Sequence, residues 1–106
     1  MKRVFVCSPF GGKAENTERA REHCRRVIDA GHAPFAPHLL YPQILNDADE
    51  AQRRCGLEMG LRFLESCDEV WVFGSLVSAG MSMEIAHAQA LGIPTIKFEG
   101  ERVEGG

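Results

Sequence analysis

Hydrophobic residues occur in two alternating patterns along this chain. Short, nearly continuous apolar runs, such as residues 3–7 (RVFVC) and 68–73 (DEVWVF), alternate with longer segments in which apolar residues recur every three or four positions. Continuous runs rich in Val and aromatic residues are typical of strands covered on both faces, whereas the longer spacing predicts amphipathic helices. The pattern therefore predicts strands that alternate with helices.

Three segments have helical spacing: residues 15–30, 50–66 and 81–91. Two weaker strands are expected at residues 33–37, where prolines favour an edge position, and at residues 93–98. Four strands alternating with three helices predict an α/β fold. We expect a flavodoxin-like (Rossmann-like) three-layer sandwich whose four-stranded parallel sheet has the order 2-1-3-4, with helices on both faces.

Length and charge narrow the class of protein. The 106 residues predict one domain at residues 1–98 and a polar tail at residues 99–106. The net charge of −3, without a Lys/Arg stripe, predicts no nucleic-acid partner. No apolar run approaches the roughly 20 residues of a membrane span, and the first residues lead directly into a strand. We therefore expect a cytoplasmic protein without a membrane partner.

The cysteines and histidines give no metal signature. Cys7, Cys24, Cys55 and Cys67 lack C-x-x-C spacing, so neither a metal nor another cofactor is predicted. Cys24, Cys55 and Cys67 are interpreted as small buried thiols, and Cys7 as structural. The isolated His23 and His32 are expected on the surface.

Two loops at strand ends carry the candidate binding residues. Residues 8–13 (SPFGGK) follow the first strand, and residues 74–80 (GSLVSAG) follow the third. In the expected strand order these loops meet at the carboxyl edge of the sheet, before two helix N-termini, which suits a phosphate or a sugar hydroxyl. His38, which follows the second strand, is expected on the same side; a loop hydrogen bond is the alternative role.

Glu84 is the candidate reactive group. We expect it in about the first turn of the helix at residues 81–91, where free backbone N–H groups favour a charged carboxylate. Such a carboxylate can act as a nucleophile or a base. Helix stabilisation alone would also explain a Glu at this position.

The helix at residues 50–66 has an unusually wide apolar stripe. One line contains Leu57, Leu61 and Leu64, and a neighbouring line contains Cys55, Met59 and Phe63. A stripe of this width predicts either a dimer interface along this helix or a broad core face.

Four segments resemble a known superfamily: CSPFGG, APHLLYPQILNDAD, GLEMGLRFLESCDEVWVFG and SAGMSMEIAHAQALGIP. They are similar to the nucleoside 2-deoxyribosyltransferase-like superfamily, and within it to a branch of small bacterial and phage-type proteins of unknown function. The resemblance implies an enzyme in which Glu84 attacks the anomeric carbon of a nucleoside or nucleotide.

The resemblance also implies a binding set around that carboxylate. Ser8, Gly11, Gly12, Ser78 and Gly80 would cradle the sugar or phosphate, and Phe10 or Met81 would form a wall for the base. Gly74 and His38, at the same strand ends, complete the candidate substrate-binding residues.

Two positions depart from the pattern of the superfamily. An Asp that contacts the leaving base corresponds to Gly60, and a Tyr that orients the nucleophile corresponds to Phe5. His38 or Glu58 are substitutes for the missing acid, and His87 is a further candidate that also suits a packing role.

Two principal functions therefore remain open. The first is cleavage or transfer of the N-glycosidic bond of a nucleoside, nucleotide or related ribosyl metabolite, as a hydrolase or a transferase. The alternative is a non-catalytic nucleotide-binding module that keeps the cleft and has lost the acid. A purely structural dimer is the third reading, which the glycine loops disfavour.

Overall fold

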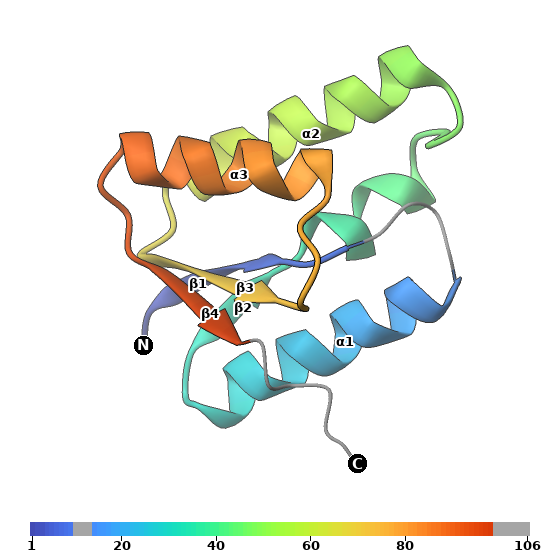
Figure 1. Cartoon of the computed structure of the whole chain (residues 1–106). Coiled ribbons are helices and arrows are strands. Elements are labelled where there is room, and N and C mark those ends of the chain that lie inside the picture. Colours follow the sequence, from blue (N-terminus) through green and yellow to red (C-terminus); the bar gives the residue numbers. More distant parts are fainter. Residues whose placement is uncertain (10–13, 99–106) are drawn as a thin grey trace.

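The computed structural model describes residues 1–9 and 14–98, in which four strands alternate with three α-helices (Figure 1). The elements are β1 (Arg3–Cys7), α1 (Ala14–Asp29), β2 (Ala33–Phe35), α2 (Glu50–Leu64), β3 (Glu69–Phe73), α3 (Ala79–Ala90) and β4 (Thr95–Phe98). Two short 3-10 helices, η1 (Pro37–Leu39) and η2 (Tyr41–Gln43), connect β2 to α2.

The sheet is parallel throughout and has the strand order β2-β1-β3-β4, so the predicted fold and topology are confirmed. Helix α1 covers one face, and α2 and α3 cover the other (Figure 1). Successive β1 side chains point to opposite faces. Val4 and Val6 pack with Val27 of α1, whereas Phe5 and Cys7 pack on the face that carries α2 and α3. Both faces of β1 are therefore core.

Some element boundaries differ from the prediction. The second strand ends at Phe35 because Pro37, which has no N–H to donate, begins η1. Helix α3 begins at Ala79 because the Ser78 side chain accepts a hydrogen bond from the Met81 N–H at 3.2 Å.

Two predicted environments are wrong. His23 is buried rather than exposed: its ring stacks on Phe73 with 4.1 Å between centroids and 6° between planes. It lies between Ala20 and Val27 on the face of α1 that packs on the sheet. Cys55 is exposed rather than buried, because its line on α2 faces away from the core.

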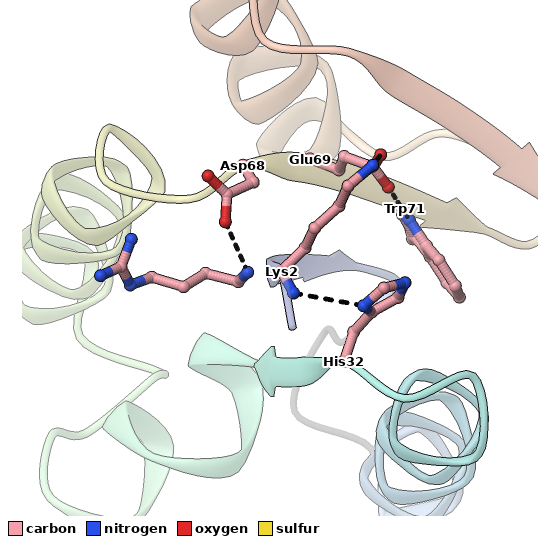
Figure 2. A network of polar contacts seen from close by, with 6 residues as sticks. Lys2, His32, Asp68, Glu69 and Trp71 are labelled. Atoms are coloured by element: carbon pink, nitrogen blue, oxygen red, sulfur yellow. Dashed lines mark hydrogen bonds and ion pairs between the residues drawn. The ribbon is translucent and has the colours of Figure 1, made fainter.

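A polar cluster joins the amino ends of the strands (Figure 2). The Lys2 ammonium donates to Glu69 at 2.6 Å, and the Arg3 backbone N–H donates to Asp68 at 2.8 Å. The Lys2 N–H donates to His32 Nδ1 at 3.2 Å, and the indole of Trp71 donates to Glu69 at 2.9 Å. The cluster fixes the starts of β1 and β3, at the edge of the sheet opposite the candidate site.

Within the described ranges, no helix has both the length and the apolar character needed to cross a bilayer.

Candidate functional site

A cleft of about 810 Å³ opens beside the first turns of α3. Its other walls come from η1, η2, the connection to α2, and α2 itself. Five predicted site residues line it: His38, Ser78, Gly80, Met81 and Glu84. The volume is within the range of small-molecule sites.

Glu84 lies in the second turn of α3, not the first, because the helix begins at Ala79. The free N–H groups of the helix start therefore do not account for its position. Its side chain is only 3% exposed, and no described residue hydrogen-bonds its Oε1 atom. A buried carboxyl oxygen without a hydrogen-bond partner is costly for folding, which singles out this position.

Burial sets the protonation of this carboxyl group. Removal from water raises the pKa of Glu84 to about 7, and the neighbouring Cys7 thiol, whose S–H donates to the Met81 carbonyl at 3.9 Å, partly opposes that rise. Burial and the nearby Glu84 carboxylate in turn raise the pKa of Cys7, so the thiol stays protonated and serves as a donor. Glu84 therefore changes charge near neutral pH.

Ser8 and His38 form a second contact between strand ends. The His38 Nε2–H donates to the Ser8 carbonyl at 2.8 Å, so His38 makes the loop hydrogen bond considered above and also lines the cleft. Burial lowers the pKa of His38, which favours the neutral imidazole. The Ser8 side chain is 1% exposed, and its hydroxyl has no partner among the described residues.

The remaining predicted residues have different placements. Gly74 has a φ of +98°, a conformation that favours glycine, and its Cα faces Pro9; it does not line the cleft. Phe10, Gly11 and Gly12 lie outside the described residues.

The candidate replacements for the missing acid differ in position. His87 Nε2 lies 3.0 Å from a Glu65 carboxylate oxygen and does not line the cleft. Glu58 does line it, from α2. Gly60 is buried, and a Cβ there would lie 3.4 Å from the Pro37 side chain, outside the cleft lining.

The sequence prediction missed the wall formed by η2 and α2. Tyr41, Asp47, Arg53 and Arg54 line the cleft. Gly56 packs against this wall, since a Cβ there would lie 3.5 Å from Tyr41, in ordinary van der Waals contact. In the sequence, the four-residue spacing of Gly56 and Gly60 puts both on one face of the helix, and this feature could have indicated that another segment packs closely there.

The strand order and the helical layers define the class of protein by fold. A similar solved structure is that of a 2-deoxyribosyltransferase from the psychrotolerant bacterium Bacillus psychrosaccharolyticus, with a TM-score of 0.74 and 18% sequence identity. The similarity covers 97% of this chain and 77% of that chain. This similarity establishes the fold.

Residues 2–98 match a family described as a domain of unknown function, DUF7768. The chain therefore belongs to the DUF7768 family. None of the curated proteins compared with the chain matches it.

Proposed function

We propose that this protein cleaves or transfers the N-glycosidic bond of a nucleoside, nucleotide or related ribosyl metabolite, with Glu84 as the nucleophile. The observation that carries the proposal is a buried carboxyl group that lines a cleft and whose Oε1 has no hydrogen-bond partner among the described residues. The similarity in fold to a 2-deoxyribosyltransferase supports the same reaction class.

The reaction divides into two displacements at the anomeric carbon. A Glu84 carboxylate oxygen forms a bond to that carbon as its bond to the base nitrogen breaks, and the bonding electrons leave with the base. Water or a second base then displaces Glu84 and releases the sugar. The neighbouring Cys7 thiol favours the ionised form of this carboxyl group.

The binding residues divide between the two ends of the substrate in this proposal. Ser8, Ser78 and Gly80 would contact the sugar or its phosphate, and Gly11 and Gly12 are proposed to share this role. Met81 or Phe10 would form the wall for the base, with His38 on the same side. Support comes from the shared cleft lining of Ser78, Gly80, Met81 and His38 and from the buried Ser8 hydroxyl.

Replacement of Glu84 by Gln tests the role of the nucleophile. Release of free base from a panel of nucleosides and nucleotides should fall by at least about a hundredfold in E84Q. The matched control is E65Q, which removes a carboxylate outside the cleft and should retain wild-type activity. Full activity in E84Q would overturn the assignment.

A non-catalytic nucleotide-binding module is the second candidate function. It is favoured by Phe5 and Gly60, which put apolar or absent side chains where the resemblance implies a Tyr and an Asp. This module would be supported if calorimetry shows that wild type and E84Q bind nucleotides equally well and neither releases the base.

The proposal includes self-association through α2. Phe63 is 54% exposed although its ring packs against Phe35 with 5.2 Å between centroids. In contrast, Leu64 is buried and Leu61 packs against the core, so a core face explains the other apolar line. A dimer measured by sedimentation that dissociates in F63R, but not in the α1 control I28R, would support this interface.

A further inference from the structure

The charged groups of the cleft are mainly acidic. Among the described lining residues there are four carboxyl groups and two guanidinium groups: Asp47, Glu50, Glu58, Glu84, Arg53 and Arg54. The Arg54 guanidinium lies 3.7 Å from the Glu50 carboxylate, so these two charges largely offset each other. With Glu84 ionised, the remaining groups leave the cleft net negative.

Among the described lining residues, Glu58 could donate a proton to a departing base but is exposed, which leaves Glu84 and His38 as the shielded candidates. Glu84 is committed to attack in the proposed reaction. His38 donates its Nε2–H to the Ser8 carbonyl, and burial lowers its pKa. The position at which the resemblance implies an acid is Gly60, which contacts Pro37. A neutral purine or pyrimidine that must be protonated as it leaves is therefore a poor match for this site.

We infer that the preferred substrates are nucleosides whose base already carries a positive charge, such as an N-alkylated purine or a ribosylated pyridinium. This inference rests on the proposed function and specifies its substrate class. When the bond to the anomeric carbon breaks, its electron pair neutralises the cationic ring, so the base leaves as a neutral molecule without a proton. Glu84 forms the new bond to carbon.

Two further features of the cleft suit a cationic ring. Tyr41 contributes an aromatic ring to the lining, and cations are attracted to aromatic faces. The buried Glu84 carboxylate is also stabilised by a positive charge nearby, so substrate binding and formation of the nucleophile favour each other.

A matched pair of substrates tests the inference. Base release from N7-methylguanosine and from guanosine is measured by chromatography, in mildly acidic buffer in which the methylated base remains a cation. Each kcat/KM is divided by the spontaneous rate for the same compound, which removes the intrinsic lability of the methylated nucleoside. We expect this rate enhancement to be at least about tenfold larger for N7-methylguanosine.

A second measurement assigns the preference to the charge of the cleft. E58Q should raise the KM for N7-methylguanosine about threefold more than the KM for guanosine, because one carboxylate that attracts the cation is lost. The control E22Q removes an exposed carboxylate on α1, across the sheet, and should change neither.

The outcomes separate the two proposals. The substrate inference is overturned if the rate enhancement for guanosine equals or exceeds that for N7-methylguanosine. The proposed function remains intact in that case, provided that E84Q no longer releases the base. An equal change in both KM values in E58Q also overturns the inference. Release from neither nucleoside, nor from the wider panel, overturns the proposed function and the inference with it.

Discussion

The carboxyl group of Glu84 has an environment that favours its neutral form and a proposed role that requires its charged form. It is 3% exposed, and burial raises its pKa to about 7. A carboxylate that is poorly solvated is a better nucleophile than one surrounded by water, whereas a buried charge opposes folding. The residue therefore couples reactivity and stability to pH.

Activity should depend on the ionisation of Glu84. Only the carboxylate attacks, so kcat/KM should rise as pH increases, with an inflection near about 7, and level off above it. The measurement is a pH profile of base release under conditions where substrate concentration is well below KM. A profile that is flat between about pH 5 and about pH 9 would contradict this role for Glu84.

Stability should depend on the same group in the opposite sense. The pKa is higher in the folded state than the ordinary 4.5, so the stabilising contribution is present below pH 4.5 and is lost as pH rises through about 7. E84Q removes this ionisable group, so its stability should not fall with pH in the same way. The unfolding free energy of E84Q minus that of wild type should therefore be larger at about pH 8 than at about pH 4, by roughly 3 kcal/mol. Urea unfolding at both pH values measures this difference.

Sequence reasoning identifies Glu84 as the candidate nucleophile but cannot give its environment. Cys7 lies 77 positions away on β1 and neighbours Glu84 because α3 packs on that strand, where the Cys7 thiol donates to the Met81 carbonyl at 3.9 Å. His23 illustrates the converse: its polar side chain suggested exposure, whereas its place between two buried positions of α1 determines its burial. Helical spacing around a residue is the better guide to its environment.

At the scale of secondary structure, helix ends position the cleft. Ser78 caps α3 and Asp49 caps α2, where its carboxylate accepts from the N–H groups of Ala51 and Gln52 at 2.9 and 3.2 Å. Each cap fixes the start of a helix that lines the cleft. The predicted start of α3 was two residues late, because Ser78 was assigned to the loop at residues 74–80.

Loss of the cap on α3 should destabilise the protein. S78A removes the acceptor for the Met81 N–H and should lower the unfolding free energy by about 1 kcal/mol. Chemical unfolding measures the effect, with S75A as control, an exposed serine in the same loop whose loss should change little. Equal stability of S78A and S75A would show that the cap contributes nothing.

An Asp at position 60, where the resemblance implies one, should not supply a proton donor to the cleft. In G60D the new side chain would begin 3.4 Å from Pro37, in the buried contact between α2 and η1. We expect a loss of about 1 to 3 kcal/mol in unfolding free energy, because the carboxylate lacks a designed partner there. Base release by G60D, measured beside a stability curve, should not exceed that of wild type; a faster enzyme would contradict the placement.

For the whole molecule, the alternation of strands and helices was sufficient to predict the sheet. Each strand is a short apolar run, and parallel order requires helical crossovers, so the pattern of the chain limits the topology. The wall of the cleft at residues 41–54 could not be predicted in the same way. It depends on the close approach of η2 and α2 at Gly56, which is a contact in three dimensions rather than a periodic signal.

The two ends of the sheet have different roles. The amino ends are joined by the cluster of Lys2, Asp68 and Glu69, whose exposed ion pair contributes little stability and chiefly fixes strand alignment (Figure 2). The carboxyl ends lead into the chain segments that carry Ser8, His38 and Glu84. This division leaves the candidate site at the edge where parallel α/β proteins usually bind ligands.

The most direct test of the account is to trap the sugar on the protein. A 2-fluoro-2-deoxy nucleoside forms the glycosyl-enzyme and slows its breakdown, so intact mass spectrometry should show one added sugar per chain. Peptide mapping should place that sugar on Glu84, and E84Q should remain unmodified. A sugar found on another residue, or base released steadily with no adduct on Glu84, would contradict the proposed nucleophile.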